Sequence, residues 1–332
     1  MKSKMLVQRI APWGYGLLLL GLVAAPFLGA YPLFVMKLLC FALFASAFNL
    51  LLGYTGLLSF GHAAFLGGAA YMAGQSIKAW GLTPELGMLL GMATGALLGL
   101  VFGWLAIRRQ GIYFAMITLA LAQMLYFVCL QVPFTGGEDG LQGVPRGKLF
   151  GVLDLGSDLS MYYVTLAIVA LAFALIVRAI HSPFGHVLAA IKENEPRAVS
   201  LGYEVDRCKL LAFVLSAALA GLAGALKTVV LGFATLSDVH WTMSGNVVLM
   251  TLIGGLGTLS GPIVGAAIVV ALENKIGEVG NFLARATGVE WFTTLGESVT
   301  MVTGLIFVLC VLLFRRGVMG ELIAWLDRRK SH

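Results

Sequence analysis

Charged side chains are scarce in this sequence. Asp, Glu, Lys and Arg make up 11% of its 332 residues, whereas soluble domains carry about 25%. Apolar residues make up 59%, and the mean hydropathy is +0.93. This balance excludes an ordinary soluble domain and predicts an all-α polytopic membrane protein.

Cysteine pairs and the usual catalytic motifs are also lacking. Ser59 and His62 lie close together, but no GxSxG elbow surrounds Ser59. Gly147 and Lys148 lack the upstream glycine of a phosphate-binding loop. The cysteines are isolated, without CxxC spacing: Cys40, Cys129, Cys208 and Cys310. We therefore expect no catalytic residue, no metal site and no cofactor in this chain.

The net charge of +6 does not indicate a nucleic-acid partner, because the basic residues lie at the ends of apolar runs. At roughly 20 residues per span, these runs fit eight to ten transmembrane helices. We place ten of them, within a single transmembrane domain over residues 1–332, at 10–29, 33–52, 60–77, 86–107, 111–132, 161–180, 208–231, 243–259, 261–276 and 298–314. The first is expected to be a retained helix and not a cleaved signal. Three lysines near span ends are expected to snorkel to the interface: Lys37, Lys227 and Lys275.

The distribution of basic residues predicts the orientation. Of the 22 Lys and Arg, fifteen fall on the side of the N-terminus and four on the other side. The positive-inside rule then places both termini in the cytoplasm, with a basic cytoplasmic tail at 315–332. The main outer loop is 133–160, whose turn-rich 135–140 is either a docking edge or a plain connection. The polar stretch 181–207 lies inside.

That polar stretch is the longest in the chain. It holds seven charges from Lys192 to Arg207, each costing roughly 2.5–3.5 kcal/mol at a membrane centre. Ser182 and Pro183 predict the start of a short helix. Pro196 begins a second helix, and a left-handed glycine, Gly202, closes it. The first helix has an apolar ridge suited to a groove on another protein, made by Val187, Leu188 and Ile191.

Two glycine-rich segments share the pattern G-x-x-G-x-L-S, at 53–59 and 254–260. We interpret them as interruptions of two spans in a possible internal repeat, a pattern typical of a transport path near the membrane midplane. The alternative is that the glycines only allow close packing. In our span count both segments have the same orientation, unless 243–259 is re-entrant or 277–297 crosses the membrane. Candidate path residues are Asn49, Gly53, Tyr54, Gly56, Ser59, His62, Asn246, Gly254, Gly257 and Ser260.

A glycine at every fourth position marks the predicted span 86–107. A stripe of this kind lets another helix backbone approach closely, so it predicts tight helix packing. A second stripe of small residues follows in the span from 208. The two stripes are Gly87, Gly91, Gly95, Gly99 and Gly103, and Ser216, Ala220 and Gly224.

Four ordered segments carry a resemblance to a known family. HSPFGHVLAAIKENEPRAVSLG (181–202) resembles the cytoplasmic coupling loop of ABC-importer permeases, in which a small residue (Ala189 or Ala190), an acid (Glu195) and a glycine (Gly202) follow one another. The others are NLLLGYTGLLSFGHAAFLGGAAY (49–71), TGGEDGL (135–141) and GGLGTLSGPIVGA (254–266). Over about 33–316 the chain resembles the longer, M-type permease of high-affinity branched-chain amino-acid ABC importers. His186 departs from it, since a basic residue is expected there.

The resemblance implies a transport subunit, not an enzyme, in the bacterial inner membrane. It would move leucine, isoleucine and valine together with a second homologous permease, two cytoplasmic ABC ATPase subunits that bind the ATP, and a periplasmic amino-acid-binding protein. The loop 133–160 would then be periplasmic and 181–207 the coupling loop. Urea, short amides or aromatic acids are alternative substrates. A rival function, an ion-coupled secondary transporter, needs a buried acid, for which Glu273 is the candidate. The expected ATPase contacts are Val187, Leu188, Ile191, Glu195 and Gly202.

Overall fold

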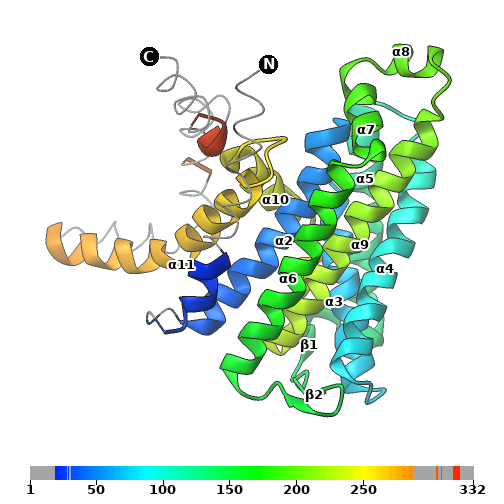
Figure 1. The fold of residues 1–332 in the computed structure, drawn as a ribbon. Coiled ribbons are helices and arrows are strands. Elements are labelled where there is room, and N and C mark those ends of the chain that lie inside the picture. The colour runs from blue at the N-terminus through cyan, green and yellow to red at the C-terminus, as the bar shows by residue number, and fades with distance from the viewer. Residues whose placement is uncertain are drawn as a thin grey trace.

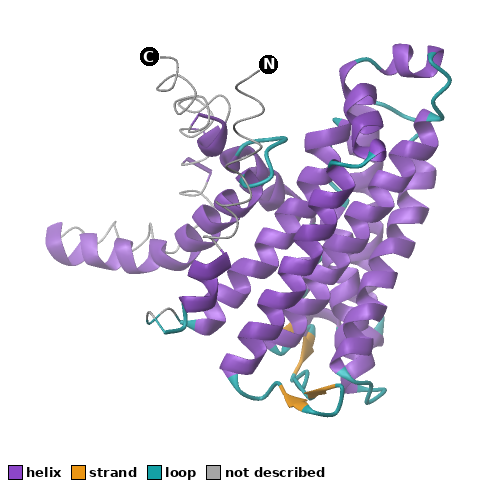
Figure 2. Ribbon diagram, in the orientation of Figure 1, coloured by secondary structure: helices purple, strands orange, loops and turns teal. Residues whose placement is uncertain are grey.

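The chain folds, in a computed structural model, into a bundle of long helices with short strand pairs at one end (Figures 1 and 2). The structure describes residues 19–27, 29, 31–287, 304–305, 308 and 317–321, with side chains up to residue 275 within the long range. Half of the predicted first span and most of the last span and basic tail lie outside these residues.

Helices predominate in the described part of the chain. Five of them are long and apolar enough to cross a membrane: α2 (Pro32–Thr55), α4 (Pro84–Ala106), α5 (Ile112–Gln131), α6 (Asp158–Ile180) and α9 (Val205–Leu231). The other helices are α3 (His62–Lys78), α7 (Pro183–Glu193), α8 (Glu195–Ser200), α10 (Trp241–Gly254) and α11 (Gly261–Thr287). The remaining elements are η1 (Pro133–Thr135), η2 (Gly137–Asp139), η3 (Leu236–Asp238), β1 (Leu141–Gln142), β2 (Lys148–Leu149), β3 (Leu153–Asp154) and β4 (Phe233–Ala234).

The five long helices begin and end within a few residues of five predicted spans, but the total of ten spans is not confirmed. The predicted span 243–259 is not one helix, because α10 has 14 residues and ends at Gly254. At 1.5 Å per residue it is about 21 Å long, short of the roughly 30 Å of a hydrocarbon core.

Helix α9 lies at the centre of the bundle and packs against α2, α3 and α4. The glycine stripe of α4 is buried along its length. A Cβ on Gly95 would lie 2.6 Å from the backbone oxygen of Ala217, and one on Gly91 would lie 2.6 Å from Ala225 Cβ. The predicted close packing is therefore confirmed, and α9 is the partner of α4.

The two ends of the bundle differ. Helices α7 and α8 cover one end, where α2 ends and α9 begins, so α2 and α9 run antiparallel (Figure 1). At the opposite end β1 pairs antiparallel with β4, and β2 with β3. The loop 133–160 thus lies at the strand end, and 181–207 lies at the α7–α8 end.

Candidate functional site

The first glycine segment interrupts the helical path inside the protein. Helix α2 ends with Gly56 in the left-handed conformation (φ 77°), and α3 begins only at His62. Ser59 in between is fully buried and accepts a hydrogen bond from the backbone N–H of Gly61. The N–H of Phe60 donates to Thr118 Oγ1 of α5 at 3.2 Å. Leu57, Ser59 and Gly61 of this non-helical backbone are thus buried in protein, which a membrane setting requires.

The second glycine segment joins α10 to α11. Gly255 and Gly257 both have positive φ, 120° and 72°, a region that favours glycine. The Thr258 hydroxyl accepts from the N–H of Gly261 at 3.1 Å and so satisfies a free donor in the first turn of α11. The chain thus turns sharply between the two helices.

The two segments contact each other, although 201 positions separate their motifs in the sequence. Asn49 Nδ2 donates to Thr258 O at 2.9 Å, and Asn49 Oδ1 accepts from the N–H of Gly257 at 3.0 Å. A Cβ on Gly53 would lie 3.0 Å from the Gly257 nitrogen, so only glycine permits this approach. We call residues 53–61 and 254–261, held together in this way, the paired break.

The predicted path residues do not all lie at the paired break. Asn49, Gly53 and Gly257 meet at the paired break, whereas Asn246 lies more than one helical turn earlier on α10. Asn49, Ser59 and His62 are buried, while Gly56 is exposed. Gly254 is buried, and Tyr54 and Ser260 are partly exposed. No residue of the set is shown to line a path.

His62 belongs to the core between α2, α3 and α9. Its Nε2 lies 2.9 Å from Ser216 Oγ, and that hydroxyl donates to Ala47 O at 2.5 Å. The rings of Phe48, Phe65 and Phe213 surround the imidazole edge-on. The structure therefore gives His62 a packing role between three helices.

The predicted repeat of 53–59 and 254–260 is not confirmed, because its copies lie in different settings. The first follows the long helix α2, whereas the second follows the short helix α10. The segments 56–61 and 232–240 resemble each other more closely. Each begins with a left-handed glycine after a long helix, and each leads into a shorter helix, α3 with 17 residues and α10 with 14. Since α2 and α9 are antiparallel, these two units point in opposite directions. Ala63 N–H donates to Ser244 Oγ at 2.9 Å where their short helices begin.

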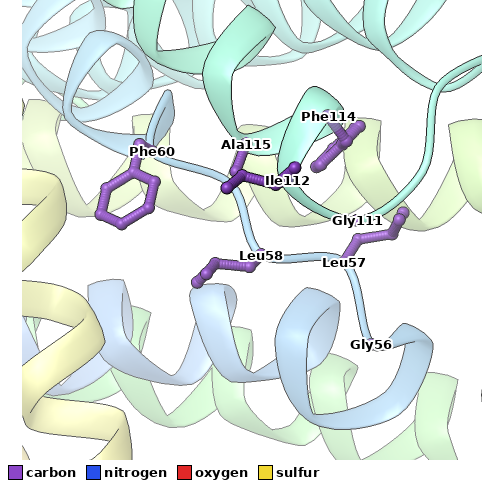
Figure 3. Close-up of a pocket in the computed structure, with 8 residues that line it drawn as sticks. All are labelled: Gly56, Leu57, Leu58, Phe60, Gly111, Ile112, Phe114 and Ala115. Atoms are coloured by element: carbon purple, nitrogen blue, oxygen red, sulfur yellow. The ribbon is translucent and has the colours of Figure 1, made fainter.

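A cavity opens beside the first half of the paired break. It has a volume of about 410 Å³ and lies between the segment 56–60 and the start of α5 (Figure 3). Its walls are almost entirely apolar, being lined by Gly56, Leu57, Leu58, Phe60, Gly111, Ile112, Phe114 and Ala115.

The polar stretch forms the two short helices predicted for it. Pro183 begins α7, and Gly202 closes the second helix with φ 85°. The Ser182 hydroxyl, expected as a cap, instead donates to Ala179 O at 2.6 Å. Asn194 caps α8 by accepting from the N–H of Arg197 at 3.1 Å. An Asn directly before a Glu-Pro pair is a recognisable helix start that our interpretation missed.

The predicted apolar ridge faces inward, which corrects our assignment of its role. Leu188 and Ile191 are 1% and 2% exposed, and Ile191 packs against Ala198 and Val205. Val187 is partly buried against the same cluster. Ile191 and Val187 therefore join α7 to α8 and α9, and the buried Leu188 and Ile191 are not available to a second protein. The exposed apolar residues lie on and after α8: Val199, Leu201 and Tyr203.

Two charged residues connect the polar stretch to other parts of the chain. Glu195 Oε1 pairs with Lys209 Nζ of α9 at 2.6 Å, and the lysine side chain is 3% exposed. Lys192 donates from Nζ to Gly53 O at 2.6 Å. The polar stretch is therefore tied directly to both α9 and the paired break.

A buried ion pair lies near the strand end. Lys227 Nζ pairs with Asp238 Oδ1, and both side chains are less than 10% exposed. The other carboxylate oxygen accepts from the N–H and hydroxyl of Thr235. The expectation that Lys227 snorkels is thus wrong. The Thr-x-x-Asp spacing of a capping box was the signal for Asp238.

Asn49→Leu is expected to destabilise the chain by about 1–3 kcal/mol. The substitution keeps nearly the same volume but leaves the N–H of Gly257 and the carbonyl of Thr258 without their partners inside the protein. Ser46→Ala, one turn earlier, is the control, because that hydroxyl bonds only its own helix. The midpoint of denaturation in detergent measures the loss, and equal midpoints for the two variants would contradict it.

Comparisons with known proteins agree on one family. Residues 33–314 match the model described as the permease component of branched-chain amino acid transport systems. The high-affinity branched-chain amino acid permease protein LivM of Salmonella typhimurium is 29% identical over 67% of this chain and 58% of its own length. A probable LivH protein of Methanocaldococcus jannaschii is 25% identical over 76% of this chain and 79% of its own length. The ribose import permease RbsC of Bacillus subtilis is 28% identical over 64% and 66%.

The chain spans somewhat less than three fifths of the length of the LivM proteins it matches. No solved structure matches it. Within the described residues, no group of three or more His, Cys, Asp or Glu side chains is placed to hold a metal.

Proposed function

Because this chain belongs to the permease-component family of branched-chain amino acid transport systems, we propose that it is the membrane subunit of an ABC importer for leucine, isoleucine and valine. The observation that carries the proposal is the direct bond between the α7–α8 end and the paired break. Such a connection lets a protein bound at that end act on backbone inside the bundle. The subunit works in the bacterial inner membrane, with the α7–α8 end and both termini in the cytoplasm.

The proposed partners are those that the family implies. Two ABC ATPase subunits bind and hydrolyse ATP, one of them docked on α7 and α8, and a second homologous permease completes the membrane part. A periplasmic amino-acid-binding protein docks at the strand end, on the loop 133–160. The basic residues of the α7–α8 end support this orientation, since it obeys the positive-inside rule.

The surface that we propose for the ATPase contact is not the ridge of Val187, Leu188 and Ile191 that the sequence predicted. Val199, Leu201 and Tyr203 offer exposed apolar surface, with exposed fractions of 57%, 68% and 47%. Glu195 acts through Lys209, fixing α8 on α9, and Gly202 provides the turn that presents Leu201. A short helix with an exposed apolar edge fits a groove on a partner.

Leu201→Asp is expected to reduce co-purification of the ATPase subunits at least tenfold, because it places an unpaired charge in the buried centre of the proposed contact. Val152→Asp, at an 84% exposed position of the strand end, is the matched control. The measurement is the amount of ATPase recovered with the tagged permease. Equal recovery with both variants would remove α8 from the proposed contact.

Branched-chain amino acids are the preferred substrates because LivM proteins match over two thirds of the chain. Permeases for ribose and for autoinducer 2 match as well, and urea, short amides and aromatic acids are further alternatives. Uptake of labelled leucine by the complex assembled with its partner subunits tests the choice, with each alternative added in excess. The proposal is supported if isoleucine and valine compete with leucine uptake and the other compounds do not. Competition by ribose would contradict the choice of substrate.

The buried ion pair argues against an ion-coupled secondary transporter. That mechanism needs an intramembrane acid that can release and rebind an ion. Asp238 is buried, but Lys227 and Thr235 already bind its two oxygens. Glu273 is partly buried on α11, and among the side chains that the structure describes it belongs to no group of three or more His, Cys, Asp or Glu placed to hold a metal ion.

A further inference from the structure

The last turn of α2 leaves backbone oxygens without helical partners. The helix ends at Thr55, and the N–H of Gly56 returns to Leu52 O. Gly53 O therefore has no partner within α2, and a buried carbonyl needs one. Its partner comes from another helix: the ammonium of Lys192, the last but one residue of α7.

The lysine also contacts the start of the interrupted segment. Its stem passes Gly56, where an added Cβ would lie 3.4 Å from Lys192 Cγ. Gly56 is the first residue of the segment 56–60 that forms one wall of the 410 Å³ cavity (Figure 3). One side chain of α7 thus binds the end of α2 and adjoins the beginning of the cavity wall.

Gly53 contacts the second half of the paired break as well. Its Cα lies so close to Gly257 N and Asn49 Oδ1 that a side chain is excluded. Asn49 in turn binds both Gly257 and Thr258. A displacement of Gly53 therefore changes contacts with both α7 and the turn between α10 and α11.

We infer that Lys192 is a positioning residue that couples α7 to the paired break, holding the segment 56–60 closed over its cavity through Gly53 O. Movement of α7 by a bound ATPase withdraws the ammonium, frees the end of α2 and lets the segment move. The inference deepens the proposed function and rests on it for the role of the ATPase. The hydrogen bond from Lys192 to Gly53 O lies within this chain and needs no partner.

A labelling experiment on the full chain tests the effect of the Lys192–Gly53 hydrogen bond on the segment 56–60 without any partner. Leu58→Cys is introduced into a chain whose own four cysteines are replaced by alanine, and the protein is placed in lipid nanodiscs. Lys192→Met keeps the apolar stem and removes the ammonium. We expect a hydrophilic maleimide to label Cys at position 58 about tenfold faster in this variant, the size expected for loss of one charged hydrogen bond.

Two further variants are the controls. Lys192→Arg restores a cationic donor and is expected to bring the labelling rate back toward the parent value. Arg197→Met removes an exposed cation from α8 and is expected to leave the rate unchanged. Equal labelling rates for Lys192→Met and Arg197→Met would overturn the inference. Lys192→Gln replaces Lys192→Met if the latter does not fold.

The assembled complex gives a second readout. Lys192→Met is expected to transport about tenfold fewer substrate molecules per ATP hydrolysed than the parent complex. A role in stability alone would lower the yield of both activities and leave their ratio intact, which would also overturn the inference. If the parent complex shows no ATP-driven uptake, the proposed function fails, and the labelling rates still decide the role of Lys192.

Discussion

Lys227→Met is expected to destabilise the chain by about 3–5 kcal/mol, because it leaves the carboxylate of Asp238 charged and unpaired in a buried site. The midpoint of denaturation in detergent measures the loss. The double variant Lys227→Met with Asp238→Asn is the matched control. It is expected to recover much of the stability, since an amide is far less costly to bury than a lone carboxylate. A double variant no more stable than Lys227→Met would contradict the pairing as the cause.

Gly224→Ala is expected to lower stability by about 3 kcal/mol or more, because the new methyl group would occupy the space of the Leu66 carbonyl on α3. The obstacle is backbone, so no side chain can rotate away and α3 and α9 must separate. Thermal melting followed by size-exclusion chromatography of the solubilised protein gives the shift.

Gly245→Ala is the control for this substitution. It makes the same chemical change in α10, at a position with open space around it. It is expected to melt close to the parent, or slightly above it, since alanine favours a helix over glycine. Similar melting of the two variants would contradict the close approach of α3 and α9.

The sequence alone was sufficient to predict most of the helical framework. Long apolar runs located α2, α4, α5, α6 and α9 because a span needs about 20 apolar residues whatever its neighbours are. The every-fourth-glycine stripe of α4 predicted close packing for the same local reason. Neither pattern identifies the partner helix, and α9 emerged only from the structure.

The candidate site was less accessible to sequence reasoning. Leu188 and Ile191 were correctly recognised as one apolar face of a short helix, but periodicity does not tell whether such a face meets its own chain or another protein. Ile191 packs on Ala198 and Val205 of the same polar stretch, and Leu188 is buried within the chain as well. The exposed apolar edge at Val199 and Leu201 has no periodic pattern that would have revealed it.

The contacts that join distant segments were the least predictable. Asn49 was selected as a polar group near a glycine break, whereas its partners lie more than 200 positions away. Lys192 looked like one of seven solvent charges, since a lysine that serves a helix end of another segment has no local signature. The backbone shape that creates its acceptor is set by Gly56, far from it in sequence.

The most direct test of the account is uptake of labelled leucine by proteoliposomes that contain this chain and its partner subunits, with all ion gradients collapsed. The account predicts uptake only when ATP is present on the α7–α8 side, and loss of that uptake in the Leu201→Asp variant. Uptake by this chain without ATPase subunits, driven by a sodium or proton gradient, would contradict it.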